Sequence, residues 1–569
     1  MAIKSITVAA DFETTVDPSD VRVWAACAVD VKTLETVFIG NSIDSFFEWL
    51  QDKNTKCYFH NLKFDGEFIL SYLLRNGYKY SESRAPKTFE CLITDNGIFY
   101  SITVIFAKEN KKYRKVTFYD SMKKLPFKVA TISKAFNLPD EKLVIDYEAP
   151  RPVGHELTEE EKAYIVNDCR IVAAALQIQI GQGLKRMTNA SDAMGNFKDV
   201  ISLKQFDRYF PVLPVELDAD IRRAYRGGFV YLKPEHKSKR GLVGCRLDVN
   251  SLYPSVMYDP DRLLPYGYPM YFEGEPDPDE NYPLFIVRFE CAFDLKPNHL
   301  PTVQLKHTFR FSPTEYLTSS EGDIIEMTMT SVDLKLFLEH YDTHGTMKYI
   351  SGWRFKGVSG IFKDYIDHWM KIKETSKGAH RQLAKLMLNS LYGKFATNPK
   401  ANKRVPYLDE DEVVRYEVID NVEKAKRHKV SPPALRDPVY TAMGAFITAY
   451  AREKTIRSGQ AVFDRFIYSD TDSLHLLGEI PPEGLEIHET KLGAWKNEGT
   501  FTDSKFIRAK TYMETTENGI EVTCAGMPDN IKKLVTYENF HEGSTFDGKL
   551  MPRRFKGGVV LMPTTFTLK

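Results

Sequence analysis

Paired carboxylates recur in this sequence in settings that suit metal chemistry. Asp11 and Glu13 end an apolar run at residues 6–10, and in a strand their two-residue spacing points both side chains to the same side. Two neighbouring negative charges are costly unless a cation lies between them. Oxygen ligands without His or Cys favour a hard cation such as Mg²⁺ or Mn²⁺. The alternative is a solvent-facing pair on an edge strand.

Two further segments supply acids that could join this pair. Residues 58–66 predict an aromatic-rich loop that carries Asp65 and leads into an apolar helix. An acidic helix start at residues 159–161 precedes Tyr164 and Asp168, which share a helix face because they are four residues apart. A phenol beside a metal-bound carboxylate can orient the water that hydrolyses a phosphodiester. The order of these acids resembles the three motifs of proofreading 3′–5′ exonucleases.

A second set of carboxylates lies far downstream. Asp248 ends an apolar strand, and Tyr253 follows it in a predicted turn. Asp470 and Asp472, again two residues apart, form the tip of a predicted hairpin over residues 466–476. The alternative for this tip is a type I turn that uses Asp and Thr as ordinary turn residues.

A basic segment lies between these two downstream carboxylate strands. Residues 371–394 contain six Lys or Arg against one Glu. Polar side chains recur there every four positions, at Lys373, Lys377, Arg381, Lys385 and Asn389, which predicts one helix with a cationic stripe and an apolar opposite face. Many charge runs are only solvated faces. Beside two carboxylate strands, however, such a helix indicates a two-metal centre that faces a triphosphate.

Composition excludes several classes of protein. The 569 residues include 77 Lys+Arg and 77 Asp+Glu and are 43% hydrophobic, which is typical of a globular multidomain chain. Zero net charge argues against a protein that coats nucleic acid by bulk charge. The apolar stretch at residues 440–451 is shorter than the ~20 residues of a membrane helix, and the N-terminus predicts no signal peptide. Seven scattered cysteines without CxxC spacing favour reduced thiols in a cytosolic compartment.

Several longer motifs extend these short patterns. DFETT, YFHNLKFDGEF, YDSMKKLPF, YRGGF, DVNSLYP, LAKLMLNSLYGKF, YSDTDS and KTY follow one another in this order. In this respect the chain resembles the protein-primed family B DNA polymerases of small Bacillus phages, the phi-twenty-nine type, over nearly its whole length. The resemblance implies an α/β plus α+β multidomain fold. A ribonuclease-H-like 3′–5′ exonuclease domain would precede a right-hand polymerase of palm, fingers and thumb, with two protein-priming insertions.

The resemblance also implies domain boundaries. The expected units are the exonuclease (1–188), the first part of the palm (189–259), a first insertion (260–360), the fingers (361–396), a second insertion (397–436), the second part of the palm (437–524) and the thumb (525–569). In the family the insertions bind the priming protein and close a tunnel around DNA. By its own pattern, the second insertion also predicts a hairpin with an acidic tip at residues 409–412.

Individual residues receive roles from the same resemblance. The exonuclease metals would be held by Asp11, Glu13, Asp65 and Asp168, while the hydrolytic water would be oriented by Tyr164. The polymerase metals would be held by Asp248, Val249 and Asp472, with Asp470 as the neighbouring carboxylate. The incoming nucleotide would contact Tyr253, Lys373, Arg381, Lys385 and Tyr392. DNA would contact His60, Asn61, Phe64, Phe68, Ser121, Lys142, Tyr225, Arg226, Gly227, Gly228, Thr448, Arg452, Arg508, Lys510 and Tyr512.

Some of these assignments have specific alternatives. Tyr253 would exclude a ribose 2′-hydroxyl and Tyr392 would pack on the nascent base pair, but both could be ordinary core tyrosines. Gly227 and Gly228 would let backbone approach phosphates, although a plain turn also uses two glycines. Arg381 stands where the family commonly has Lys, and Arg contacts phosphate as a planar fork instead of a point charge.

The implied function is DNA-directed DNA synthesis on a linear viral genome, with protein-primed initiation, strand displacement and 3′–5′ proofreading. Each active site would use two Mg²⁺ or Mn²⁺ ions, and the substrates would be dNTPs. The expected partners are primer-template DNA, single-stranded DNA and a terminal protein, with no membrane, for a monomer in the host bacterial cytoplasm. The alternatives are an exonuclease with a merely DNA-binding C-terminal half and a non-catalytic binding module. Paired carboxylates repel phosphate, so a pure binder has no need of Asp248, Asp470 and Asp472.

Overall fold

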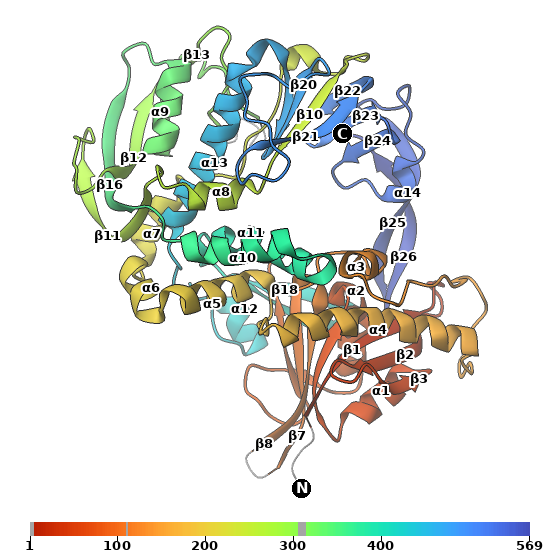
Figure 1. Cartoon of the computed structure of the whole chain (residues 1–569). Helices are drawn as coiled ribbons and strands as arrows, with labels where there is room; N and C mark the ends of the chain where they lie inside the picture. The colour runs from red at the N-terminus through yellow and green to blue at the C-terminus, as the bar shows by residue number, and fades with distance from the viewer. Residues whose placement is uncertain (1–4, 110–111, 305–314) are drawn as a thin grey trace.

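The computed structural model describes residues 5–109, 112–304 and 315–569. Residues 305–314, part of the expected first insertion, lie outside the described chain. In Figure 1 the N-terminal sheet and its helices lie at the lower right, and helices α10 (Lys363–Thr375) and α11 (Gly378–Phe395) separate them from the sheets above. Layers of helix on mixed sheet beside antiparallel sheets confirm the expected α/β plus α+β multidomain fold.

The N-terminal unit is built on a mixed sheet with the strand order β3-β2-β1-β4-β8-β7-β6-β5. Its strands are β1 (Ser5–Thr14), β2 (Val23–Asp30), β3 (Thr36–Gly40), β4 (Asn54–Phe59), β5 (Lys79–Tyr80), β6 (Thr88–Ile93), β7 (Phe99–Glu109) and β8 (Lys112–Asp120). The central strands β1, β4 and β8 are parallel. Its helices are α1 (Ile43–Leu50), α2 (Leu62–Arg75), η1 (Ser121–Lys123), α3 (Val129–Phe136) and α4 (Glu159–Gly181).

Both faces of this sheet are covered by helices, as the side chains of strand β2 show. Its sequence is continuously apolar, as expected of a strand that is buried on both sides. Alternate side chains point to opposite faces. Cys27 and Val29 join the core formed with α3 and α4, whereas Ala26 and Ala28 join the core formed with α1 and α2.

An antiparallel sheet in the order β21-β10-β20-β19-β9 carries the downstream carboxylates. Its strands are β9 (Val230–Leu232), β10 (Gly244–Val249), β19 (Phe466–Asp470), β20 (Ser473–Leu477) and β21 (Trp495–Phe501). The predicted hairpin is confirmed, because Asp470 pairs with Ser473 across a tip made of Thr471 and Asp472. Around the sheet lie α8 (Leu252–Tyr258), α13 (Thr441–Ala461), η2 (Pro234–His236) and η3 (Phe463–Arg465).

The single cationic helix predicted for residues 373–389 is wrong. Helix α10 ends at Thr375, Ser376 and Lys377 are extended, and α11 begins at Gly378. Gly378 has a φ of +55°, a conformation that glycine adopts readily, so the chain turns back. The remaining helices of this region are α5 (Asn189–Ile201), α6 (Leu203–Tyr209) and α7 (Val215–Arg222).

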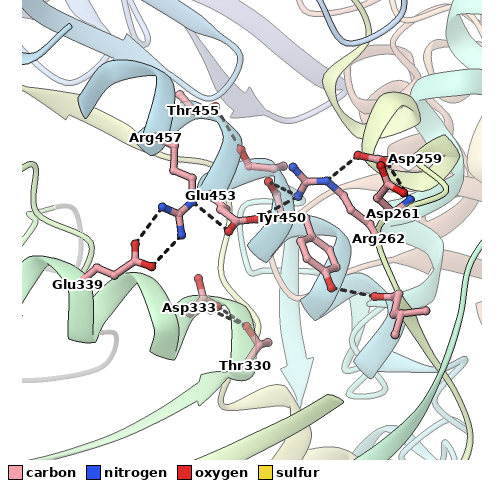
Figure 2. Close-up of polar contacts among 12 residues, drawn as sticks. Asp259, Asp261, Arg262, Thr330, Asp333, Glu339, Tyr450, Glu453, Thr455 and Arg457 are labelled. Carbon is pink, nitrogen blue, oxygen red and sulfur yellow. Dashed lines mark hydrogen bonds and ion pairs between the residues drawn. The ribbon is translucent and has the colours of Figure 1, made fainter. Parts of the chain in front are cut away.

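The segment between α8 and α10 forms a small unit with its own core, which includes Phe289, Phe293 and Phe337. Its elements are β11 (Leu264–Glu273), β12 (Leu284–Cys291), β13 (Asp294–Leu295), β14 (Ile325–Thr330), α9 (Ser331–His340), β15 (Tyr341–Asp342) and β16 (Lys348–Val358). Figure 2 shows how charged residues fasten it to α13. Arg457 forms ion pairs with Glu339 of α9 at 2.9 Å and with Glu453 at 3.1 Å.

Two hairpins complete the fold. The hairpin predicted with an acidic tip at residues 409–412 is confirmed by β17 (Lys403–Leu408) and β18 (Val414–Ile419), and α12 (Val422–His428) follows it. The C-terminal region contains β22 (Asp503–Arg508), β23 (Thr511–Thr516), β24 (Gly519–Cys524), α14 (Asp529–Lys532), β25 (Thr545–Phe555) and β26 (Gly558–Thr567). In Figure 1 the long β25–β26 hairpin extends from the upper sheets down to α2.

Two simple expectations can be compared directly with the structure. All seven cysteines lie in the described part of the chain and are free thiols, as expected. Among the described residues no helix is sufficiently long and apolar to span a bilayer. From Thr441 onward the apolar stretch belongs to α13, which packs in the protein core.

Candidate active sites

The N-terminal carboxylates come from three separate elements that meet at one end of the sheet. Strand β1 carries Asp11 and Glu13, α2 carries Asp65, and α4 carries Asp168. Asp65 lies in the first turn of α2 and not in the predicted loop. The helix begins early because Asn61 adopts a left-handed φ of 73°, which turns the chain directly from β4 into α2.

The electrostatics of these carboxylates indicate a shared site. Burial, and then the charge of Asp168, raises the pKa of Asp11 to about 7. Burial and the charge of Asp11 likewise raise the pKa values of Glu13 and Asp65. Lys142 forms an ion pair with Asp168 and donates a hydrogen bond to the Tyr164 hydroxyl at 3.1 Å. The lysine therefore partly balances the clustered negative charge.

The donor set of this site suits a hard divalent cation. Asp168 Oδ1 is buried without a hydrogen-bond partner, and such an orphaned oxygen is costly unless a cation or donor reaches it. Among the described residues, no three His, Cys, Asp or Glu side chains are already grouped closely enough to hold a metal ion. The oxygen ligands fit such a cation, whose charge would offset their mutual repulsion.

Tyr147 joins this site although its sequence carried no signal. Its hydroxyl lies 2.5 Å from the Tyr164 hydroxyl, and the two rings meet edge to face. Tyr147 belongs to the irregular segment between α3 and α4, where neither helical nor strand spacing relates it to the acids. Only folding brings the two phenols together.

The residues predicted to grip a frayed primer strand also lie nearby. His60 Nδ1 is 2.9 Å from Ser121 Oγ, and His60 Nε2 is 2.7 Å from the Phe127 carbonyl oxygen. Ser121 is fully buried, and its hydrogen bond with His60 fixes the orientation of the His60 ring. The Phe64 ring is half-buried and contacts Phe68, which is buried. In this arrangement Phe64 and the exposed Asn61 are more accessible to DNA than Phe68.

The downstream carboxylates share one pocket, whose lining includes Asp248, Asp470 and Asp472. Strand β10 and the β19–β20 hairpin are neighbours, and the Val249 N–H donates a hydrogen bond to the Asp472 carbonyl at 2.7 Å. Burial, and then the charge of Asp472, raises the pKa of Asp248 to about 7. Lys510 Nζ contacts both carboxylate oxygens of Asp470, at 2.6 and 2.8 Å.

Glu498 is a further carboxylate of this pocket that the sequence pattern did not reveal. It lines the pocket, and its charge contributes to the raised pKa of Asp248. Lys496 pairs with Asp248 across strands β21 and β10, and its ammonium group lies 2.7 Å from Glu498. Both residues lie on β21, a strand with no recognisable motif, so its register against β10 alone places them there.

The residues predicted to contact a nucleotide converge beside the pocket. Tyr253 and Tyr392 stack with their ring centroids 3.9 Å apart. Tyr253 lies in the first turn of α8 and not in the predicted isolated turn. Pro254 is the next residue, and the first turn of a helix tolerates proline because its N–H groups need no partner within the helix.

The bend between α10 and α11 gathers the predicted triphosphate contacts. Arg381 Nη1 donates to the Lys373 carbonyl at 2.8 Å, and Lys373 Nζ donates to Ser251 Oγ at 2.8 Å. Burial lowers the pKa of Lys373, and the charges of Lys385 and Arg381 lower it further. Three cations that repel one another in a partly buried site are suited to an anion.

The YRGGF segment is held in place by the buried side chain of Arg452. Arg452 is buried, forms an ion pair with Asp333 of α9 at 2.7 Å, and donates to the carbonyls of Arg226 and Gly227 at 2.9 and 2.7 Å. A side chain at Gly228 would collide with Thr471 of the carboxylate hairpin, at 2.6 Å. Arg452 therefore positions this segment against the hairpin, and sequence reasoning missed the role of Asp333.

The other predicted DNA contacts differ in how accessible they are. Thr448 is buried and donates to the Gly444 carbonyl at 3.0 Å, and Arg226 donates to the Thr328 carbonyl at 2.9 Å. Arg508 is exposed, and its Nε donates to the carbonyl of Lys569. The remaining positions are the half-buried Tyr225 and Tyr512 and the exposed Gly227.

One carboxylate centre lies on the N-terminal sheet. The other lies on the downstream antiparallel sheet, beside a cationic bend and two stacked tyrosines. Together they define a DNA polymerase that carries an additional nuclease-like centre. The family model described as DNA polymerase type B, organellar and viral, matches residues 48–152 and 146–487. The chain belongs to this family and is a DNA-directed DNA polymerase of the phi29 type.

Several phage polymerases are similar to this chain over nearly its whole length. The DNA polymerase of Bacillus phage phi29 is 45% identical over 98% of this chain and 98% of its own. The DNA polymerase of Streptococcus phage Cp-1 is 33% identical over 99% of this chain and 98% of its own. A solved structure of phi29 DNA polymerase with primer-template DNA and incoming nucleotides covers 99% of this chain and 100% of its own, at 45% identity and a TM-score of 0.93.

Proposed function

We propose that this polymerase replicates a linear viral genome from a protein primer, displaces the non-template strand and proofreads with its N-terminal domain. The observation that carries the proposal is the pocket in which Asp248, Asp470 and Asp472 lie together beside the cationic bend. The units would be those expected from the sequence, with the exonuclease at 1–188 and the polymerase from 189 onward. The chain would act as a monomer in the cytoplasm of an infected bacterium.

In the polymerase site, Asp248, Val249 and Asp472 would hold two divalent ions, Mg²⁺ or Mn²⁺. These ions supply Lewis acidity and charge neutralisation for attack of the primer 3′-hydroxyl on the α-phosphorus. The side chains of Lys373, Arg381 and Lys385 neutralise the triphosphate. Asp470 holds Lys510 beside the primer end, which favours a primer phosphate in this position.

The two stacked tyrosines would select the incoming nucleotide. Tyr253 lies immediately after the metal strand, so its ring would clash with a ribose 2′-hydroxyl, and Tyr392 would support the new base pair. Because the rings already stack on each other, little rotamer entropy remains to be lost when a nucleotide binds.

In the exonuclease site, Asp11, Glu13, Asp65 and Asp168 would hold the metal ions that make water nucleophilic. Tyr164, fixed by Tyr147 and Lys142, orients this water toward the scissile phosphate. A single strand would be held by His60, Asn61, Phe64 and Lys142, and the buried Ser121 and Phe68 would contribute indirectly, by positioning His60 and Phe64. Stacking of a base on Phe64 fits the sequence-tolerant way in which single strands are bound.

The DNA partners are proposed from relatives at 44% identity. One solved phi29 polymerase structure is a complex with primer-template DNA, and another is a complex with single-stranded DNA. The duplex would follow Tyr225, Arg226, Gly227, Gly228, Thr448, Arg452, Arg508, Lys510 and Tyr512. For the buried members, above all Arg452, the contribution would be indirect, through the backbone that they position.

Paired variants test the two activities. Asp472→Ala should abolish Mg²⁺-dependent primer extension and retain degradation of single strands, and the Asp11→Ala, Asp168→Ala double variant should do the reverse. Extension that survives Asp472→Ala would overturn the assignment of the polymerase site.

Protein priming is tested separately by supplying dATP and a candidate terminal protein, and the expected result is a covalent protein–nucleotide adduct.

An exonuclease whose C-terminal half only binds DNA is the alternative. It predicts degradation without template-dependent incorporation, so an incorporation assay on a primed template with and without Mg²⁺ separates the two. The clustered cations and carboxylates of the second pocket favour polymerisation, because carboxylates alone would repel the DNA backbone.

A further inference from the structure

The C-terminal hairpin connects two distant cores. At its base, Phe546 and Phe566 pack in the core that includes α14 and strands β22–β24. Near its tip, Val559 belongs to the core of the N-terminal sheet, and Gly558 lies so close to Phe68 of α2 that a Cβ there would be 2.3 Å from the ring. Helix α11 meanwhile packs on α3 and α4 of the N-terminal unit. These contacts close a protein ring.

The β17–β18 hairpin of the second insertion is anchored beside the same helix. Val414 also belongs to the core of the N-terminal sheet. Arg404 Nε donates to the Asp95 carbonyl at 2.9 Å, which fixes the base of the hairpin. Both hairpins therefore end on α2, although they are separated by more than a hundred residues of chain.

Glu67 of α2 lies at the junction of the two hairpins. It is 3% exposed, and each of its carboxylate oxygens has a different donor. Oε1 accepts from Arg554 Nε of β25 at 2.8 Å, and Oε2 accepts from the Tyr416 hydroxyl of β18 at 2.9 Å. The Arg554 guanidinium also lies over the Tyr416 ring, 4.7 Å from its centroid.

Withdrawing either hairpin would leave a buried carboxylate oxygen without its donor. Such an orphaned charge is strongly unfavourable, much more than the loss of a solvated ion pair. A second ion pair links the two hairpin tips, Lys556 and Glu412, but these side chains are 58% and 46% exposed. Exposed pairs contribute little, so the tip contact alone cannot hold the ring closed.

We propose that Glu67 is the latch of this ring: it holds the β25–β26 and β17–β18 hairpins together on the exonuclease helix α2 and so keeps the polymerase on its DNA. The inference rests on the proposed function, in which DNA passes through the ring. Glu67 is a positioning residue and contacts no reacting atom.

The test uses the full-length chain and measures processivity, as the product length per binding event on a primed single-stranded circle with a heparin trap. Glu67→Ala should shorten products about tenfold, because the buried anchor of both hairpins is lost. Tyr416→Phe and Arg554→Met should each shorten them by a smaller factor. The matched control is Glu412→Gln, which removes the exposed tip pair and should change product length less than twofold.

A second readout separates a latch from a merely structural residue. Single-nucleotide incorporation with enzyme in excess, at saturating dNTP, should be equal in all variants, and Tyr416→Phe should still melt cooperatively, well above the assay temperature. Unchanged product length in Tyr416→Phe and Arg554→Met would overturn the proposal, whatever the folding of Glu67→Ala. An equal loss in Glu412→Gln would also overturn it. Absence of incorporation by the parent chain would instead contradict the proposed function.

Discussion

The two carboxylate centres of this polymerase are assembled in different ways. Asp11, Asp65 and Asp168 come from a strand and two helices on opposite faces of one sheet. Asp248 and Asp472 come from one strand and an adjacent hairpin tip in one antiparallel sheet. The first centre therefore depends on how helices pack on a sheet, and the second depends on strand register.

A similar contrast applies to the lysine that balances each centre. Lys142 is 33% exposed and pairs with Asp168, which is 6% exposed. Lys510 is 54% exposed and pairs with Asp470, which is 23% exposed. The N-terminal centre is more deeply buried, so its charges interact more strongly. Substitutions there should perturb folding as well as activity, whereas substitutions in the polymerase pocket should mainly affect chemistry.

The largest expected effect is in the polymerase pocket. Asp248→Asn keeps the shape of the side chain and removes a charge that would hold metal, so Mg²⁺-dependent primer extension should fall by at least about 10³-fold. Degradation of single strands, measured on the same preparation, is the control and should be unchanged. Loss of both activities would mean that the two centres are not independent.

The corresponding change in the N-terminal centre is Asp65→Asn. Degradation should fall by at least about 10²-fold, while single-nucleotide incorporation persists. Because Asp65 is buried in the first turn of α2, we also expect an altered melting temperature, which Asp248→Asn should not show to the same degree. Equal shifts in the two variants would contradict the difference in depth.

Tyr147→Phe should have an intermediate effect on degradation only. The change removes the hydroxyl that contacts Tyr164, and with it one restraint on the orientation of that phenol. Single-turnover degradation should slow by about three- to tenfold, in the range of one lost neutral hydrogen bond. Normal degradation in this variant would show that Tyr147 does not position Tyr164.

Glu498→Gln should shift the pH dependence of incorporation. Its negative charge contributes to raising the pKa of Asp248, so its removal should lower that pKa and preserve incorporation to lower pH. The acidic limb of the pH–rate profile is the measurement. An unmoved limb would show that the titration of Asp248 does not control it.

The smallest expected effect is a change in the melting temperature of the metal-free protein. The pKa of Asp11 is raised from 3.8 to about 7, so the folded state binds more protons than the unfolded state between these values, and stability falls as pH rises through that window. In EDTA, Asp11→Asn should therefore raise the melting temperature by about 2 °C at pH 8 and less at pH 5. Asp17→Asn is the control, because two hydrogen bonds from Ser19 lower the pKa of Asp17.

Much of the fold class and the identity of the key acids could be predicted from local patterns. Asp11 with Glu13, and Asp470 with Asp472, are close in sequence, so strand geometry alone places each pair together. The hairpin at residues 403–419 was predictable because its strands and its polar tip are contiguous. The single helix expected at residues 373–389 failed because four-residue spacing continues through Ser376 and Gly378, where the backbone turns.

The sequence by itself determined which residue types are available for metal and phosphate chemistry, because those signals are short-range. The tertiary structure alone decided which distant groups meet: Tyr147 with Tyr164, Glu498 with Asp248, Asp333 with Arg452, and Glu67 with Arg554 and Tyr416. None of these pairs shares a periodicity or a turn. Their proximity results from the pairing of distant strands and the packing of separate elements, whose contact free energy does not depend on sequence separation.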